Sequence, residues 1–263
     1  EKDANQLQVD SILSTINRIS NSSSFEGVKL LNGTYDYTTS GLSTTSAFTS
    51  ISINSAKVGA TSLAVNVSVI TSAQTGKLEF LGSSSGLNGA ATVSIAGNLG
   101  TVQLSFASST KSSAIGASVN QFKDSTGVTA ILSADQKSVT LISNDYGTSQ
   151  FVTVTSNNST ALSTQDENNV VTSSNYGRNA TLTVNGTSAV SDGLKVKAVF
   201  GDLLDVNFTL NSGANTNGAS KTFGITGGGA TFSLGAQVNT ANTASIGIGN
   251  INTGSVGKVV SNS

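Results

Sequence analysis

The sequence predicts a mainly β, multi-domain chain of the α+β class with a minor helical part. In several short stretches, apolar residues recur at every second position, which is the period of a half-buried strand. One stretch near the start instead has apolar residues at three- and four-residue steps, the period of an amphipathic helix. The 263 residues are enough for roughly two or three modules.

The first helix is predicted over residues 5–21. Its apolar side chains share one face and belong to Val9, Ile12, Leu13, Ile16 and Ile19. Because only this narrow stripe is apolar, the helix needs partners to cover it, and we expect those partners to lie outside the chain.

A second helix is predicted between residues 112 and 124. Its apolar face consists of Ile115, Val119 and Phe122. Gly127 offers a stop signal, and two strands should follow, around 128–132 and 138–142. A helix packed on a small sheet covers apolar surface that a lone hairpin leaves exposed.

Alternating apolar and polar residues mark the other strands. They lie around residues 63–69, 102–106, 180–184, 194–200 and 206–210. Asn185-Gly186 follows one of these strands and favours a tight turn, because both residues tolerate positive φ. Short strands separated by Gly and Asn indicate antiparallel modules. Three polar stretches without periodicity are predicted to be linkers or surface loops: 38–46, 157–174 and 211–220.

Composition argues against several classes of protein. Charged residues make up 10% of the chain and the net charge is −1, so no basic field is present to hold nucleic acid or anionic lipid. His and Cys are both absent, which leaves no Ser-His-Asp or Cys-His catalysis and no such ligands for structural zinc. No apolar run reaches the roughly 18 residues of a membrane span. We therefore expect no enzyme, no nucleic-acid partner and no membrane partner.

Three features resemble sites, and each has a simpler interpretation. Asn-x-Ser/Thr triplets begin at Asn32, Asn66, Asn158, Asn179, Asn185 and Asn207, and a Ser/Thr-rich chain produces such triplets by chance. The Gly-rich stretch 224–229 lacks the Lys of a phosphate-binding loop and is expected to be a turn or linker. Asp192, Asp202 and Asp205 are too sparse for calcium, which takes about six to eight oxygen ligands. We expect no catalytic, metal or cofactor-binding residues and no cofactor.

Two runs near the start join the first helix to a hairpin. They are Ile16-Asn17-Arg18-Ile19-Ser20-Asn21 and Ser24-Phe25-Glu26-Gly27-Val28-Lys29-Leu30-Leu31-Asn32-Gly33. They resemble the inner rod-like domain of bacterial flagellins, in which Phe25 would anchor the hairpin and Gly27 would allow its turn. Near the end, residues 231–236 and 246–253 resemble the flagellin segment that follows that hairpin.

The middle of the chain carries further similarity to the same family. Residues 115–155 are similar to the flagellin hook IN motif. Residues 177–186, followed by Asp192-Gly193-Leu194, resemble an outer-domain pattern that often has Asp where this chain has Asn179.

The resemblance implies a specific domain organisation. The inner domain would comprise residues 1–37 and 231–263. An outer variable region, 38–230, would be inserted between them and would divide into two β-rich modules near 157–177. Because the chain starts at Glu1 and not at Met, we expect a fragment that lacks both ends. Val9 to Leu31 and Thr231 to Thr253 would then pack together as one unit.

The resemblance also implies a function. The chain would belong to a secreted, extracellular subunit of the bacterial flagellum filament, which self-assembles for motility and exposes its middle on the filament surface. Its partners would be other flagellin subunits, bound through terminal helices absent here, together with hook-associated proteins and innate immune receptors. Glycosylation would fall on Ser or Thr of the outer region. The alternatives are a hook-associated flagellar protein and a carbohydrate-binding or adhesin module. The candidate sugar contacts are Tyr35, Tyr37, Tyr146 and Tyr176.

Overall fold

The computed structural model describes residues 2–25, 27–41, 47–58, 61–81, 86–235 and 242–254. The fold is mainly β with a minor helical part, as the sequence predicts, and contains three α-helices in these ranges. The chain forms two compact units. Unit 1 comprises Glu1–Ile70, Leu182–Val190 and Lys195–Ser263, and unit 2 comprises Thr71–Thr181 and Ser191–Leu194. The stretch 157–177, where the sequence suggests a division between modules, lies within unit 2.

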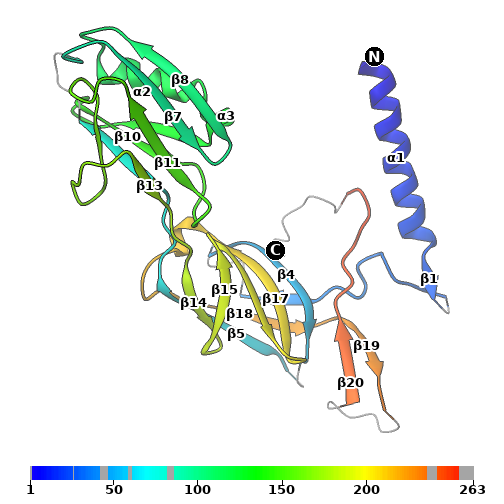
Figure 1. The fold of residues 1–263 in the computed structure, drawn as a ribbon. Helices are drawn as coiled ribbons and strands as arrows, with labels where there is room; N and C mark the ends of the chain where they lie inside the picture. Colours follow the sequence, from blue (N-terminus) through cyan, green and yellow to red (C-terminus); the bar gives the residue numbers. More distant parts are fainter. Residues whose placement is uncertain are drawn as a thin grey trace. The chain divides into compact units, whose positions relative to one another are not determined.

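Unit 1 is built around an eight-stranded antiparallel sheet (Figure 1). Its strands, in spatial order, are β3 (Thr38–Ser40), β18 (Ser220–Gly227), β5 (Leu63–Thr71), β14 (Thr181–Val184), β15 (Thr187–Asp192), β16 (Lys195–Phe200), β17 (Leu204–Leu210) and β4 (Phe48–Ala56). The predicted alternation is confirmed in β5 and β17, where every second residue is buried. The polar stretch 211–220 contains a short 3-10 helix, η1 (Ser212–Ala214), before β18 begins.

Three phenylalanines show that this sheet curls. Phe48 lies on β4, at one end of the strand order, and Phe223 lies on β18, next to the other end. Their ring centroids are nevertheless 5.3 Å apart, and the Phe48 ring is 5.4 Å from that of Phe208. Both pairs are edge-to-face, the arrangement that aromatic quadrupoles favour. The inner face of the curled sheet is therefore the core of unit 1.

The predicted Asn185-Gly186 turn joins β14 to β15. Both residues have positive φ, 49° and 81°, as a two-residue hairpin turn requires. Cross-strand pairing places Val184 opposite Thr187 across the turn. The Asn185 side chain also accepts a hydrogen bond from the backbone N–H of Asn66 over 2.8 Å, which joins the turn to β5.

Unit 2 contains two four-stranded sheets and two helices around a single core. One sheet has the order β12 (Thr164–Gln165), β6 (Lys77–Leu81), β10 (Ser138–Ser143) and β9 (Val128–Leu132). The other has the order β13 (Ser174–Tyr176), β11 (Phe151–Ser156), β7 (Ala91–Gly97) and β8 (Gly100–Phe106). The predicted strands at 102–106, 128–132 and 138–142 are confirmed.

The helix predicted over 112–124 is two helices, α2 (Ser112–Asn120) and α3 (Lys123–Thr126). Ile115 and Val119 are buried as predicted, but Phe122 is 38% exposed, so its assignment to the same face is wrong. The physical reason is that α2 ends first: the Asn120 side chain exchanges two hydrogen bonds with the backbone of Ala130 on β9, 2.9 and 2.8 Å long. Gly127 ends α3 with φ 74°.

The ends of unit 1 hold a long helix and two hairpins. Helix α1 (Lys2–Ser22) confirms the helix predicted over 5–21. Strands β1 (Ser24–Phe25) and β2 (Val28–Lys29) form the first hairpin, whose turn contains Gly27 at φ 80°. The Phe25 side chain, expected to anchor this hairpin, lies outside the described part of the structure. Strands β19 (Ala230–Ser233) and β20 (Thr243–Ile246) form the second hairpin.

Candidate assembly surface

Helix α1 exposes the apolar stripe that its sequence predicts. Ile12 is 60% exposed, Val9, Leu13 and Ile19 are exposed as well, and Ile16 is half-buried. Ser20 is the buried residue of this helix. In proteins, an amphipathic helix draws most of its stability from packing of its apolar face. The α1 stripe, defined as these five apolar residues, is therefore a candidate surface for association.

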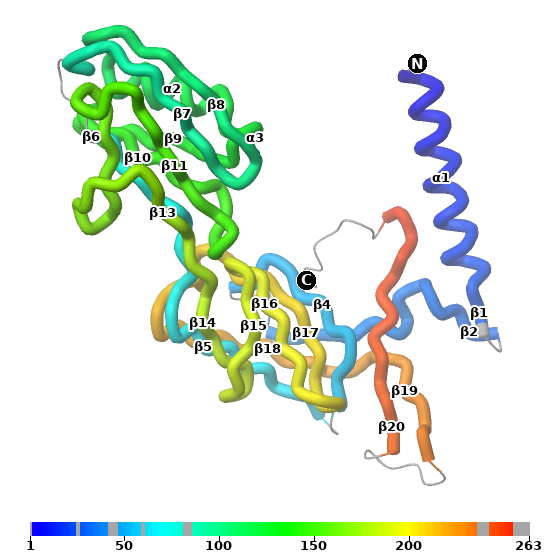
Figure 2. The backbone as a smooth tube through the Cα atoms, viewed as in Figure 1, coloured from blue at the N-terminus to red at the C-terminus, as the bar shows by residue number. Residues whose placement is uncertain are grey.

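Asn17 joins α1 to the far end of the chain. Its Nδ2 lies 2.9 Å from Oγ1 of Thr253, and its Oδ1 accepts a 2.9 Å hydrogen bond from the backbone N–H of Thr253. Both side chains are half-buried. Figure 2 shows the segment after β20 running beside α1. A residue of the first helix and one near the end of the chain thus satisfy each other's polar groups.

Further backbone contacts extend this junction. The N–H of Ile251 donates to the carbonyl oxygen of Leu31 over 3.3 Å, and Tyr35 pairs with Ile248 in an antiparallel bridge. The Tyr37 hydroxyl is 2.8 Å from Oγ of Ser245. Asn17 and Leu31 thus contact the returning segment at Thr253 and Ile251, whereas packing of Val9 to Leu31 as a whole on Thr231 to Thr253 stays a prediction, because most apolar residues of α1 are exposed.

A second exposed apolar surface lies on the β19–β20 hairpin. Phe232, Leu234 and Ile246 are 50%, 74% and 49% exposed. Phe232 and Ile246 lie on one face of the hairpin, since Phe232 pairs with Ala244 and Ile246 pairs with Ala230. In the sequence, Phe232 and Leu234 alternate with Thr231 and Ser233, and this alternation is a signal from which the apolar face could have been predicted.

The acidic residues considered for a metal site are engaged in other contacts or stand apart. Asp202, whose side chain is 92% exposed, lies 3.9 Å from Lys57, a distance at the limit of an ion pair. Asp205 accepts a hydrogen bond from Asn54 over 3.0 Å. Asp192 lies at the end of β15. Across the described residues, no group of three or more acidic, His or Cys side chains could hold a metal ion.

Most of the Asn-x-Ser/Thr asparagines have a structural role. Five of the six donate or accept a side-chain hydrogen bond: Asn32, Asn66, Asn158, Asn179 and Asn185. Asn179 accepts from the backbone N–H groups of Thr148 and Gly193. Residues 224–227 of the Gly-rich stretch belong to strand β18, so the predicted turn is wrong there and holds only for Gly228 and Gly229, which lead into β19. Gly228 has φ 91° and lies so close to the Asp36 carbonyl that a Cβ would be 2.1 Å from its oxygen.

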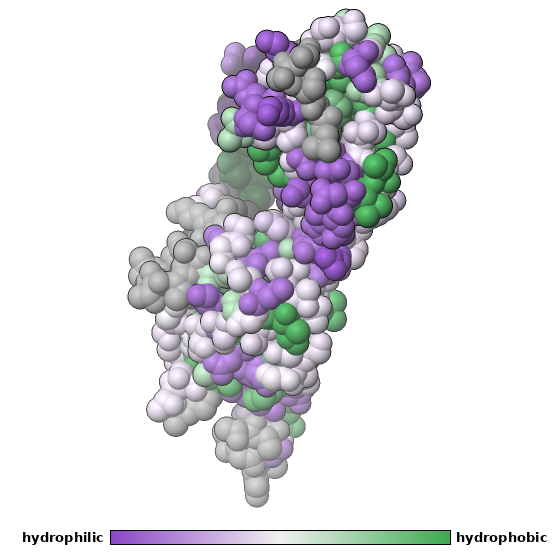
Figure 3. All heavy atoms as spheres, turned by 90° about the vertical axis from the view of Figure 1, so that its left-hand side faces the viewer, coloured by the Kyte–Doolittle hydropathy of each residue, from purple (hydrophilic) through white to green (hydrophobic). Residues whose placement is uncertain are grey.

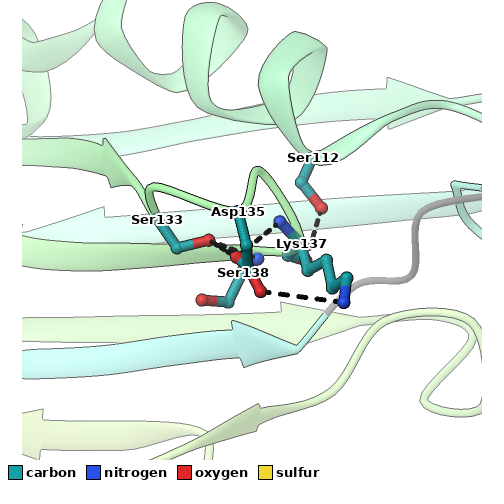
Figure 4. A network of polar contacts seen from close by, with 5 residues as sticks. All are labelled: Ser112, Ser133, Asp135, Lys137 and Ser138. Atoms are coloured by element: carbon teal, nitrogen blue, oxygen red, sulfur yellow. Dashed lines mark hydrogen bonds and ion pairs between the residues drawn. The ribbon is translucent and has the colours of Figure 1, made fainter.

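The turn between β9 and β10 contains a small polar network (Figure 4). Ser133 donates to Oδ1 of Asp135 over 2.6 Å, and the Lys137 N–H donates to the same oxygen over 3.1 Å. These hydrogen bonds, that of Ser133 above all, lower the pKa of the Asp135 carboxyl below the usual 3.8. Ser112 donates to the Lys137 carbonyl over 2.9 Å and so attaches the start of α2 to the turn. Because the Asp135 side chain is 59% exposed, the network stabilises a turn and offers no enclosed site.

The four tyrosines considered for sugar contacts lie in different environments. Tyr37 is 4% exposed, and its hydroxyl accepts from the Ala56 N–H over 2.8 Å, so this ring is part of the core. Tyr35 and Tyr146 are half-buried. Tyr176 is 64% exposed and is the most accessible of the four.

The surface as a whole is poor in charge. The face drawn in Figure 3 is largely pale or purple with small green patches, as Ser, Thr, Gly and Asn produce. Among the described helices, none is long and apolar enough to cross a membrane. No protein-family model matches the chain. No curated protein matches it significantly.

Proposed function

We propose that this chain is the central part of a subunit of a bacterial flagellar filament, with the α1 stripe as its assembly surface. The observation that carries the proposal is a long helix whose apolar face is uncovered while its last turns are attached to the returning segment through Asn17 and Thr253. A helix held at one end and apolar along its length is suited to packing with other helices. In the family that the sequence resembles, such helices polymerise and the inserted region faces outward.

Charge and composition support the same proposal. A filament grows through heterologous contacts repeated along a path that does not close. The α1 stripe has no acidic or basic member, so copies can pack without like-charge repulsion. Unit 2 buries its own apolar residues in a separate core, which suits a module that tolerates exposure to solvent outside the helical assembly.

Immunogold electron microscopy tests the location. Antibodies raised against the 263-residue chain are applied to intact cells of the source organism. We expect labels along extracellular filaments, at regular intervals. Labelling confined to the cell body or cytoplasm would overturn the proposal.

A matched pair of substitutions in the encoded subunit tests the assembly surface. Ile12→Asp places a charge in the stripe and should abolish filaments and swimming, because an unpaired carboxylate buried between helices costs several kcal/mol. Val190→Asp changes another exposed apolar residue, 76% exposed on β15, and should leave filaments intact. If both variants assemble equally well, the α1 stripe is not the assembly surface.

A further inference from the structure

One face of a sheet in unit 2 has no charged residue. The sheet consists of β13, β11, β7 and β8 (Figure 1), and none of these strands contains Asp, Glu, Lys or Arg. Val93, Ile95, Val152 and Val154 point into the core. Because successive strand residues alternate between faces, the intervening residues point outward.

The outward residues are rich in hydroxyl groups. Cross-strand pairing places Thr153 beside Ser174, with their oxygens 2.9 Å apart, and Thr92 beside Ser105, with their oxygens 3.1 Å apart. Gln103 is exposed and pairs with Ser94 on the neighbouring strand. The face thus presents short, uncharged donors and acceptors on a regular strand spacing.

An aromatic pair lies at one end of this face. Phe151 and Tyr176 are cross-strand partners on β11 and β13, with ring centroids 5.7 Å apart and planes inclined by 38°. The Tyr176 side chain is 64% exposed although the neighbouring ring contacts it. A large exposed ring on an edge strand is a surface on which an apolar ligand face can stack.

A groove of about 330 Å³ lies at the other end of β11. Its lining contains Thr155, Ser156, Ser163 and Thr172 together with the apolar Leu162 and Val171, and no residue in the lining is charged. Thr155 of the outward face borders the groove, and the core residues Val154 and Leu162 also line it, so the groove extends from the outward face toward the core. Thr155 lies four positions after Phe151, which is about 13 Å at the rise of a strand.

We propose that this face binds a neutral oligosaccharide, with Tyr176 and Phe151 stacking against one sugar ring and the Ser/Thr-lined groove holding another part of the chain. Sugar rings combine apolar C–H faces with hydroxyl groups at their edges. This face offers an aromatic ring on which the C–H face can stack, and hydroxyl groups that can bind the sugar hydroxyls. The lack of any charged residue on it disfavours nucleic acid, acidic polymers and basic peptides, which need opposite charge. The site goes beyond filament assembly and does not depend on it, because unit 2 has its own core.

The test is a titration of the full 263-residue chain, followed by NMR. The probes are neutral hexasaccharides of glucose, mannose and N-acetylglucosamine, with a sialylated oligosaccharide for comparison. We expect saturable binding of at least one neutral probe, with shifted amide signals in β11, β13 and the groove. Tyr176→Ala should weaken binding about three- to tenfold, the size of one aromatic contact.

Two variants act as controls. Tyr176→Phe keeps the ring and should bind as the original chain does. Phe232→Ala removes an exposed aromatic ring from β19 in unit 1 and should change nothing. The proposal is overturned if no neutral probe saturates up to about 10 mM, if the sialylated probe binds best, or if Tyr176→Ala binds like the original. Since none of these outcomes involves filament assembly, a failure here leaves the proposed function untouched.

Discussion

Helices α1 and α2 both carry an apolar stripe, but only α2 is covered by its own chain. Ile115 and Val119 of α2 are 3% and 1% exposed in the core of unit 2. In α1, which is more than twice as long, Val9 and Ile12 are 48% and 60% exposed. Fully burying a Leu or Ile side chain contributes roughly 1.5–3 kcal/mol. A partner that covered the apolar residues of α1 would therefore be bound with a favourable contribution from each of them.

The difference shows how to distinguish apolar residues that form a core from apolar residues that are available to a partner. Helix α2 is short, and its polar groups are also bound: Ser112 to the Lys137 carbonyl and Asn120 to Ala130. Within the described residues, the side-chain hydrogen bonds that attach α1 to other segments involve Asn17, Ser20 and Asn21, all in its last two turns. An amphipathic helix such as α1, which is attached at one end and has an exposed apolar face, indicates a surface for a partner. A helix such as α2, which is attached at both ends and has a buried apolar face, belongs to the core of its own unit.

The largest expected effect on stability comes from matched Ile→Ala substitutions, one in the core of unit 2 and one on the exposed face of α1. Ile95→Ala removes a fully buried side chain from unit 2 and should lower the free energy of unfolding by about 3 kcal/mol, because a cavity remains. Ile12→Ala in α1 should change it by no more than about 0.5 kcal/mol. Urea unfolding followed by circular dichroism measures both. Equal losses would mean that α1 is as well covered as the core.

The next effect concerns backbone geometry where the chain crowds together. Gly193 has φ 58°, and a Cβ would lie 2.2 Å from the Tyr146 carbonyl oxygen. Gly193→Ala should therefore destabilise unit 2 by about 2 kcal/mol or more. Gly201→Ala shares the positive φ, 54°, but meets nothing within 4 Å, so it should cost only about 1 kcal/mol. Thermal unfolding of both variants separates strain in φ from steric overlap; a smaller loss for Gly193→Ala would contradict the crowding.

A more local effect is expected where α1 meets the returning segment. Asn17→Ala removes the acceptor for the Thr253 N–H, so exchange of that amide should speed up about fivefold, as loss of one hydrogen bond of about 1 kcal/mol predicts. Hydrogen exchange resolved by NMR is the measurement. Asn5→Ala, an exposed change on the same helix, is the control. Unchanged Thr253 exchange in Asn17→Ala would show that other contacts hold the junction.

The smallest effect concerns the turn between β9 and β10. Ser133→Ala removes the main hydrogen bond to the Asp135 carboxylate, so the lowered pKa of Asp135 should rise toward 3.8. A carboxyl whose pKa is lowered in the folded state adds stability above its ordinary pKa, and this stability is lost as pH falls through the folded pKa. Any loss of stability in Ser133→Ala is therefore present at neutral pH and disappears in acid. A ¹³C titration of the carboxyl measures the pKa, with Ser125→Ala as control because Ser125 donates to Phe122 instead. A pKa unaltered by Ser133→Ala would falsify the assigned cause.

Sequence periodicity by itself determined most elements of this protein. The three-and-four spacing from Val9 to Ile19 defines α1, and the alternation in β5, β16 and β17 defines strands, because local backbone geometry sets which side chains share a face. The Asn185-Gly186 turn was equally readable, since few residues adopt its positive φ values. Composition also indicated the low charge of the surface.

Only the tertiary structure decided how distant parts meet. The closeness of Phe48 to Phe223 joins residues far apart in the sequence, and the end of α2 at Asn120 and the groove beside Thr155 depend on contacts between separate elements. Their energies come from contacts formed after the chain folds, and a local pattern carries no record of them. Periodicity shows which face of a strand or helix is apolar, whereas only three-dimensional packing shows whether that face is covered by the same chain.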